Sequence, residues 1–464
     1  MSEGHLPEPA RRTRPVAVLG AGITGLTAGW MLRKAGAPVT VFEAADRAGG
    51  TIGAIREQGW LHEGGPNTLL EGSAEVAALI DAVGLGPRRR YAAPAAKKRF
   101  VVRGGRLLAM PDSPLAFVSS RLFSWRAKLG ALGEPFRPAH AGDGEESVAD
   151  FVVRRLGREF LDYAVDPFVA GVYAGDPREL SLPQAFPKLC ALEKEHGSLT
   201  RGAIKRRNPS VAPRRRILSF PNGLEELSSA MAGALGDSLR LRSRVTALAR
   251  GDGGWRVRFE NNGAPSQEDF SAVICALPPD ALSQLAWPEI PSASGLGLLR
   301  EIVQPPVISI FTGFRRQDIV HPLDGFGFLV PRVEHRRILG TLFSSTLFSG
   351  RAPEGHVALT TFVGGTREPE LALLKDQTVL EIALAELADL LGLRGLPVIS
   401  RLRRWQRAIP QYNLGYQRFK DACSAVEAAS PGLFIGGNCR DGISLSACIE
   451  SGRRLARAAL AGAR

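Results

Sequence analysis

Cysteine and histidine are scarce in this chain, and neither is spaced like a set of metal ligands. The five cysteines lie at scattered positions without a Cys-x-x-Cys pair, and the seven histidines show no ligand spacing either. An odd number of isolated cysteines is typical of free thiols in a reducing compartment. We therefore expect neither a disulfide framework nor a metal site.

The chain also lacks the run of about 18 to 20 consecutive apolar residues that a membrane-spanning helix needs. The first fifteen residues are polar and carry acids and prolines, so they are unlike a signal peptide. We expect a cytoplasmic protein. Residues 111–126 mix Leu, Phe and Trp with Arg, as interfacial helices do. Peripheral contact with the inner face of the cell membrane is therefore a hypothesis, and a helix packed on its neighbours is the alternative.

Acidic residues are outnumbered, and aromatic residues are few. The chain has 59 Lys and Arg against 46 Asp and Glu, and its net charge is +13. Basic clusters occur at 88–90, 97–99, 205–207 and 214–216. No nucleic-acid motif accompanies them and aromatic residues make up only 7%, so we expect no nucleic-acid partner. An anionic membrane face, an acidic small molecule or a solvated arginine-rich surface would each explain the charge.

A dinucleotide-binding pattern stands near the start of the chain. Residues 15–19 (PVAVL) have the composition of a buried parallel strand, and a helical pattern covers 26–35. A second strand over 39–42 ends at Glu43, which completes a βαβ unit of the usual length. The turn after the first strand is Gly20-Ala21-Gly22-Ile23-Thr24-Gly25.

Each residue type in this turn suits a phosphate site. Gly20 permits a tight turn, Gly22 lets the backbone approach a pyrophosphate, and Gly25 lets helix and strand pack closely. The helix N-terminus directs N–H groups and a positive dipole end at the phosphates. Glu43 is placed to accept hydrogen bonds from ribose hydroxyls. A glycine turn without a nucleotide is the alternative, but the complete βαβ pattern argues against it.

Two further segments favour FAD over NAD. Arg47, Gly49 and Gly50 follow Glu43 and resemble the second phosphate loop of amine oxidase-like flavoproteins. Near the other end of the chain, a strand over 432–435 leads into a Gly-Gly-Asn turn and a helical run through 449–452. A helix N-terminus directed at the flavin would stabilise negative charge on it. A docking helix at the C-terminal end is the alternative.

The length of 464 residues exceeds one ordinary core, so several domains are expected. Helices are predicted over 147–157 and 160–169, and a turn followed by a helix over 219–235. Strand-like segments cover 239–248, 255–259 and 272–277, and an antiparallel sheet is expected from 307–314, 326–330, 338–342 and 357–363. We predict an α/β fold. Its Rossmann-like FAD-binding domain comprises 14–90, 214–285 and 406–464, its helical and membrane-associating domain 91–213, and its substrate-binding sheet domain 286–405.

Several motifs resemble the protoporphyrinogen and coproporphyrinogen oxidase family over nearly the whole chain. The Gly-Val-Tyr-Ala-Gly-Asp-Pro run at 171–177 is the most specific, because generic flavin-dependent amine oxidases lack it. The others are at 64–67 (GGPN), 180–181 (LS), 186–187 (FP), 325–330 (GFGFLV), 362–365 (FVGG) and 409–412 (IPQY). The resemblance implies bound FAD in a p-hydroxyphenylacetate hydroxylase-type domain. It also implies oxidation of a porphyrinogen by O₂ with release of hydrogen peroxide, six electrons leaving in three flavin cycles.

The resemblance also implies which residues form the site. Arg99 would grip a substrate propionate, and a guanidinium suits a carboxylate because the pair is bidentate and charge-assisted. Phe362 and Leu329 would sandwich the flat macrocycle with Phe326 beside them, and the backbone of Gly171 would lie against the pyrrole nitrogens. The expected cofactor contacts are Gly20, Gly22, Ile23, Thr24, Gly25, Glu43, Arg47, Gly49, Gly50, Gly65, Pro66, Asn67, Val245, Gly437 and Ile443.

No side chain stands out as a catalytic base, although His62, His196, His321 and His335 are available. We therefore expect catalysis by positioning and by the flavin itself. Arg99 favours protoporphyrinogen IX as substrate, with coproporphyrinogen III as the alternative. An amine oxidase, a carotenoid desaturase and a non-catalytic relative of the GDP-dissociation inhibitors are further alternatives. A monomer and a homodimer both fit the sequence.

Overall fold

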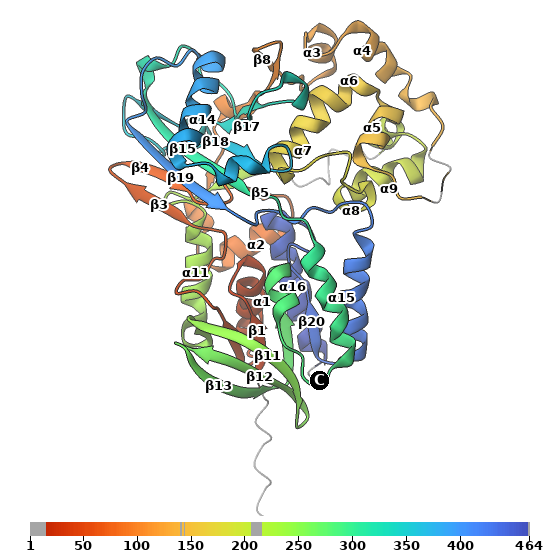
Figure 1. Ribbon diagram of the computed structural model, residues 1–464, viewed down its shortest axis with the longest axis vertical. Helices are drawn as coiled ribbons and strands as arrows, with labels where there is room; N and C mark the ends of the chain where they lie inside the picture. The colour runs from red at the N-terminus through yellow and green to blue at the C-terminus, as the bar shows by residue number, and fades with distance from the viewer. Residues whose placement is uncertain (1–14, 140–141, 143, 206–215, 463–464) are drawn as a thin grey trace, which may run out of the picture. The chain divides into compact units, whose positions relative to one another are not determined.

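The computed structural model describes residues 15–139, 142, 144–205 and 216–462 (Figure 1). The chain folds into two compact units, and each is built from separate chain segments. Unit 1 comprises Met1–Gly50, Ser228–Arg300 and Asp421–Arg464, and unit 2 comprises Thr51–Leu227 and Glu301–Lys420. The expected mixed α/β fold is confirmed, while the finer five-segment division of the chain stays a prediction.

Unit 1 is centred on a parallel sheet with the strand order β10-β2-β1-β14-β20. Its strands are short and mostly buried, as expected of a sheet covered on both faces. The strands are β10 (Leu239–Arg240), β2 (Val39–Phe42), β1 (Val16–Leu19), β14 (Ala272–Cys275) and β20 (Leu433–Ile435). Helix α1 (Ile23–Lys34) joins β1 to β2 and packs along α16 (Leu445–Gly462). The predicted βαβ unit is therefore confirmed.

Helix α1 begins at Ile23, three residues before the predicted start. Two glycines lie in or next to its first turn, and glycine is a poor helix former, so the pattern alone placed the start too late. A second, antiparallel sheet of unit 1 consists of β11 (Ser243–Gly251), β12 (Gly254–Asn261) and β13 (Ala264–Phe270). The mostly exposed β13 carries no apolar alternation, so it was not predicted. The remaining helices here are α11 (Glu225–Leu235), α12 (Pro279–Gln284) and α15 (Gln417–Ala429).

Unit 2 contains a seven-stranded sheet with the order β19-β15-β18-β17-β16-β7-β8. The four predicted strands are β15 (Val307–Arg315), β16 (Gly327–Leu329), β17 (Ile338–Leu342) and β18 (His356–Gly364), and they pair antiparallel as expected. Three strands were missed because charged residues interrupt their apolar pattern: β7 (Arg99–Arg103), β8 (Arg106–Ala109) and β19 (Ile399–Trp405). Small sheets are formed by β3 (Ala54–Glu57) with β4 (Trp60–Glu63), and by β5 (Leu69–Glu71), β9 (Arg216–Ser219) and β6 (Arg90–Tyr91).

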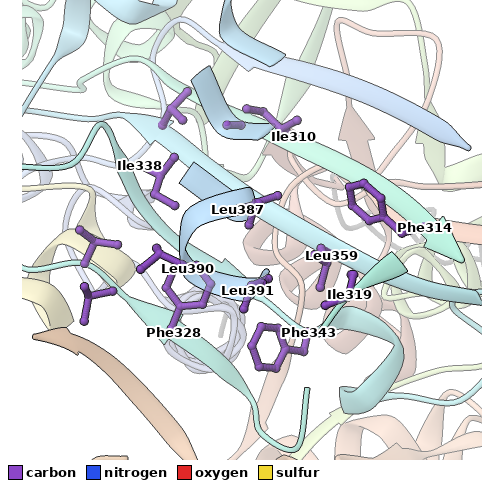
Figure 2. Close-up of a cluster of buried hydrophobic side chains, with 14 of the residues drawn as sticks. Ile310, Phe314, Ile319, Phe328, Ile338, Phe343, Leu359, Leu387, Leu390 and Leu391 are labelled. Atoms are coloured by element: carbon purple, nitrogen blue, oxygen red, sulfur yellow. The ribbon is translucent and has the colours of Figure 1, made fainter. Parts of the chain in front are cut away.

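One face of the large sheet forms the main core of unit 2. Helix α14 (Asp376–Leu391) packs Leu387, Leu390 and Leu391 against alternate strand residues such as Phe328 and Leu359 (Figure 2). Side chains alternate between the two faces of a strand. The residues between those of the core, such as Leu329 and Phe362, therefore lie on the opposite face, which we call the site face.

The helical part of unit 2 includes the predicted helices near 147–157 and 160–169. Ser147 caps α5 (Val148–Arg155) by accepting a hydrogen bond from the Asp150 amide at 3.0 Å. The second prediction corresponds to a short helix, a π-helical turn over Leu161–Val165 and α7 (Asp166–Tyr173). The helices are α2 (Ala74–Ala82), α3 (Pro114–Ser119), α4 (Trp125–Leu132), α5 (Val148–Arg155), α6 (Arg158–Phe160), α8 (Leu182–Ala185), α9 (Pro187–His196), α10 (Leu199–Lys205) and α13 (Ser344–Leu347). None of the helices in the described ranges is long and apolar enough to span a bilayer.

Candidate active site

The glycines after β1 are required by the close approach of neighbouring backbone. A Cβ on Gly25 would lie 1.8 Å from the Gly20 carbonyl oxygen, so α1 could not keep its position against β1. Gly20 has φ +92° and lies against the Ala276 carbonyl. Gly22, in contrast, has open space around the position of its missing Cβ. The sequence motif therefore builds a cradle whose backbone is accessible at Gly22.

The chemistry of this cradle suits a dinucleotide. No side chain caps the N-terminus of α1, and its first turn contains no acidic residue. Its free N–H groups can therefore donate hydrogen bonds to an anion. Ile23 and Thr24 belong to this first turn. At the end of β2, the two oxygens of Glu43 accept hydrogen bonds from the Ala21 amide at 2.8 Å and the Ala45 amide at 2.9 Å. The carboxylate keeps lone pairs for ribose hydroxyls.

The second phosphate loop lies beside the first. The Gly49 amide donates to the Ala21 carbonyl at 2.8 Å, and a Cβ on Gly50 would lie 3.2 Å from the Gly22 Cα. Arg47 donates to the carbonyls of Ala48 and Gly50, so its guanidinium also stabilises the loop itself. Val245 lies at a bulge in β11, where the pairing with β12 shifts register.

The turn after β20 is held by a polar network that the sequence did not reveal. The Gly437 amide donates to Asp441 Oδ2 and to Ser451 Oγ, both at 3.1 Å, and Arg454 pairs with Asp441 at 2.9 Å. Ile443 precedes Ser444, whose hydroxyl accepts from the Ala447 amide in the first turn of α16. Asp441 next to a glycine, ten residues before a serine on a helix, is too weak a pattern to predict this network.

The site face of unit 2 brings together the residues that were expected to hold the substrate. Leu329 on β16 pairs with Gly340 on β17, and Gly340 pairs with Phe362 on β18. Paired residues project from the same face, and neighbouring strands lie about 4.8 Å apart, so Leu329 and Phe362 stand about 10 Å apart. A Cβ on Gly340 would lie 3.2 Å from Leu329 Cδ2, so the Leu329 side chain occupies part of the space over this glycine. We call the row from Leu329 over Gly340 to Phe362 the gap.

Arg99 belongs to the same face. It pairs with Gly327 on the neighbouring strand, two residues from Leu329, and its side chain is exposed. The guanidinium carbon lies 5.4 Å from the ring centre of Phe326, within the range of a cation–π contact. Phe326 packs in a small cluster with Ala96 and Phe348. This ring is thus placed to orient the Arg99 guanidinium.

Helix α7 covers part of the site face. A Cβ on Gly171 would lie 2.4 Å from Leu329 Cδ2, so this glycine lets the helix backbone approach the sheet. Phe168 and Val172 are exposed on the same side of α7, at the i and i+4 positions around Gly171. Sequence reasoning missed both residues, although their spacing from Gly171 was visible.

The loop at Gly64–Asn67 also packs closely against neighbouring backbone of unit 2. A Cβ on Gly65 would lie 2.1 Å from the Thr51 carbonyl oxygen, and Trp405 Nε1 donates to the Gly64 carbonyl at 2.9 Å. Pro66 and Asn67 are half-buried, and the Asn67 amide donates to the Gly65 carbonyl at 3.0 Å. The loop is therefore rigid, as a cofactor-binding loop needs to be.

A buried ion pair lies directly before this loop. Glu63 Oε1 accepts from the Leu224 amide at 3.0 Å and pairs with Arg351 at 3.1 Å, and both side chains are almost fully buried. The two residues line a small cavity together with His62, Asn67 and Thr360. Burial raises the pKa of Glu63 to about 7, although Arg351 and the Leu224 amide act in the opposite direction. Glu63 was not singled out in the sequence.

Two of the four candidate histidines lie beside a glutamate: His62 Nε2 is 3.6 Å from Glu57 Oε1, and His196 Nε2 is 3.8 Å from Glu195 Oε2. His62 stacks on Phe311 at 4.9 Å between ring centres, and burial lowers its pKa. His321 Nδ1 accepts from the Leu323 amide at 3.0 Å, and burial lowers its pKa as well. His196 ends α9 and His335 has a left-handed backbone conformation at φ +54°. Each of the four thus has a structural surrounding.

Comparison with known proteins identifies the family pattern. The pattern of the family described as flavin-containing amine oxidoreductases matches residues 23–460. The mitochondrial protoporphyrinogen oxidase of Nicotiana tabacum is 35% identical over 94% of this chain and 93% of its own length. The coproporphyrinogen III oxidase of Bacillus subtilis (strain 168) is 26% identical over 94% of this chain and 96% of its own.

A solved structure from Exiguobacterium sp. 255-15 has the same fold. It superposes with a TM-score of 0.80 over 97% of this chain and 99% of its own, at 24% sequence identity. At this sequence identity the comparison supports a shared fold only.

Proposed function

Because this chain belongs to the family of flavin-containing amine oxidoreductases, and has protoporphyrinogen and coproporphyrinogen oxidases among its relatives, we propose that it oxidises a porphyrinogen to a porphyrin in haem biosynthesis. It is an FAD-dependent oxidoreductase. When bound, FAD supplies the acceptor for the two electrons removed in each cycle. Molecular oxygen is the proposed final acceptor, with hydrogen peroxide as the second product.

The substrate assignment depends on one observation. Leu329, Gly340 and Phe362 form a row across three strands of the site face. Two apolar side chains separated by a glycine suit a macrocycle that is flat and largely apolar. Arg99 stands two residues away on the same face and suits a propionate. A small amine substrate would need neither the width of this gap nor an exposed arginine.

The chain's own contribution to the reaction is positional. The glycine cradle and Glu43 of unit 1 hold the dinucleotide, and the Gly65–Asn67 loop is proposed to contact the cofactor as well. Leu329, Phe362 and Gly171 orient the macrocycle and exclude water from its faces. None of the described side chains is assigned as the base, so the pyrrole proton is proposed to leave to solvent.

The choice between two porphyrinogens is made on Arg99. The exposed guanidinium of Arg99 suits a propionate of protoporphyrinogen IX, which is therefore the proposed substrate. Coproporphyrinogen III carries four propionates. It stays the second candidate, because the Bacillus subtilis relative bears that name and is similar over nearly its whole length.

The test uses the purified protein loaded with FAD in air. Protoporphyrinogen IX and coproporphyrinogen III are supplied separately, and porphyrin fluorescence is followed together with peroxide release. We expect faster oxidation of protoporphyrinogen IX, with one peroxide for each two electrons removed. A preference for coproporphyrinogen III would move the enzyme to the second candidate. Oxidation of neither by a protein with bound FAD would refute the proposal.

A peripheral membrane contact is proposed for the helical part of unit 2. Helix α4 and the turn after it expose Trp125, Leu129, Leu132 and Phe136 on one stripe, and Phe136 is 84% accessible. Such a stripe of apolar residues beside basic ones is typical of interfacial helices. Co-sedimentation with anionic vesicles should fall in a Leu129→Ser/Leu132→Ser variant and persist in Leu373→Ser, which changes a still more exposed leucine elsewhere. Equal sedimentation of both variants would contradict the contact.

A further inference from the structure

Three chain segments that each carry one residue of the proposed substrate gap meet at one buried carboxylate. Asp166 is the first residue of α7, the helix that carries Gly171. Asp166 Oδ2 accepts from the Arg332 amide and from Arg367 Nη2, both at 2.8 Å. Arg332 follows Leu329 by three residues, and Arg367 follows Phe362 by five. One carboxylate thus joins the helix to the ends of β16 and β18.

Arg367 extends this junction to a second point. Its Nη1 donates to the Val330 carbonyl at 2.6 Å, directly after Leu329. The side chains of Arg367 and Asp166 are only 8% and 6% exposed, so water does not screen the pair. Charge-assisted hydrogen bonds of this kind are short and directional. They therefore fix the start of α7 against the strand that holds Leu329.

The other end of α7 is also held from the sheet. Gln411 Nε2 donates to the Tyr173 carbonyl at 2.7 Å, and the Thr366 amide donates to the Ala174 carbonyl at 2.8 Å. The guanidinium of Arg332 pairs with Asp176 at 2.8 Å, just beyond the helix. With both ends held, Gly171 in the middle of α7 cannot move away from Leu329 without breaking one of these contacts.

The ion pair is poorly arranged for stability alone. Among the described residues, Asp166 Oδ1 and Arg367 Nε are buried without a hydrogen-bond partner. A buried pair with unsatisfied atoms recovers little of its desolvation cost, whereas apolar packing at the same place would serve stability better. What the pair does supply is a fixed geometry between α7, β16 and β18.

We propose that Asp166 and Arg367 are positioning residues that fix how closely α7 packs against Leu329 and Phe362, and that this packing controls the binding of the macrocycle. This inference rests on the proposed function, because it assigns the gap to a porphyrinogen. Neither side chain touches the substrate; each acts through the backbone of the segment that it holds. A displacement of about 1 Å at such a gap costs on the order of 100-fold in rate.

The experiment compares four FAD-loaded variants. Asp166→Asn removes the charge but keeps an acceptor, and Arg367→Lys keeps the charge but not the two-point geometry. Asp166→Asn/Arg367→Gln removes both charges, so it folds even if a single unpaired charge does not. The matched control is Arg337→Gln, which breaks the exposed Arg337–Glu368 pair on the same sheet without touching α7.

We expect Asp166→Asn and the double variant to raise KM for the porphyrinogen, and Kd for the porphyrin product, at least about tenfold, which is 1.4 kcal/mol. KM and Kd of the double variant should be no higher than those of Asp166→Asn, because the two residues act as one pair. KM and Kd of Arg367→Lys should lie between those of these variants and those of wild type. FAD content and the reaction of the photoreduced enzyme with oxygen should match wild type in all of them.

Unchanged KM and Kd in Asp166→Asn and the double variant would overturn the inference. A loss of kcat in proportion to folded protein, with KM unchanged, would also overturn it, since that is the result of a purely structural pair. The proposed function fails in a different way. A wild-type protein that neither oxidises a porphyrinogen nor binds a porphyrin would remove the assigned substrate, and this inference with it.

Discussion

Replacing Glu63 by glutamine should change how the stability of the protein depends on pH. Burial raises the pKa of Glu63 from the ordinary carboxyl value of 4.5 to about 7, against the attraction of Arg351. The folded state therefore binds this proton more tightly than the unfolded state does. The resulting stabilisation is fully present below pH 4.5 and is lost as the pH rises through 7.

The size of the effect follows from that pKa. Each pKa unit corresponds to about 1.4 kcal/mol, so the free energy of unfolding should fall by about 2 to 3 kcal/mol between pH 5 and pH 8 because of Glu63 alone. In Glu63→Gln this group no longer titrates. Glutamine resembles the protonated carboxyl that wild type holds at pH 5. The informative quantity is the free energy of unfolding of wild type minus that of the variant, which should fall by about 2 to 3 kcal/mol between pH 5 and pH 8.

Urea unfolding followed by circular dichroism at pH 5, 6, 7 and 8 measures this difference. The ionic strength and an excess of FAD are held constant, because bound cofactor stabilises the folded state. Glu370→Gln is the control, since it removes a carboxylate from the surface of the same unit. A difference that does not change between pH 5 and pH 8 would refute the reasoning. It would mean that Arg351 keeps Glu63 ionised throughout and that attraction outweighs burial.

Three further changes test the two halves of the site. Gly25→Ala places a Cβ 1.8 Å from the Gly20 carbonyl, so we expect loss of FAD, seen as a lower ratio of flavin to protein absorbance after gel filtration; a wild-type ratio would contradict the cradle. Arg99→Ala should raise KM for the porphyrinogen about tenfold, the value of one lost charged hydrogen bond. Arg106→Ala changes an exposed arginine on the neighbouring strand and should leave KM unchanged. Equal effects on KM would contradict the role of Arg99. Gly340→Val places a Cβ 2.5 Å from the Phe328 carbonyl oxygen and 3.2 Å from Leu329 Cδ2, so it displaces Leu329. Porphyrin binding should then weaken by at least about tenfold at unchanged FAD content; unaltered binding would mean that the macrocycle lies elsewhere.

The cofactor half of the site was readable from the sequence because it depends on contacts that are local in the chain. Gly20, Gly22, Gly25 and Glu43 lie within one βαβ unit, and their spacing reflects the path of one strand, one turn and one helix. Four adjacent strands of the large sheet in unit 2, β15 to β18, were also predictable, since apolar residues dominate each of them. The strands carrying arginines, such as β7, were missed because their pattern is broken by charge.

The proposed substrate half depends on pairing between distant segments, which only the tertiary structure shows. Gly340 gave no sign in the sequence that it separates Leu329 from Phe362, because the register of β17 is set by hydrogen bonds to two other strands. Nor could the sequence place Asp166 against Arg367, 201 residues further along the chain. The positions of a turn glycine or a capping serine depend on residues nearby in the chain, so a sequence pattern can indicate them. Strand register and buried ion pairs depend on which segments the whole fold brings together.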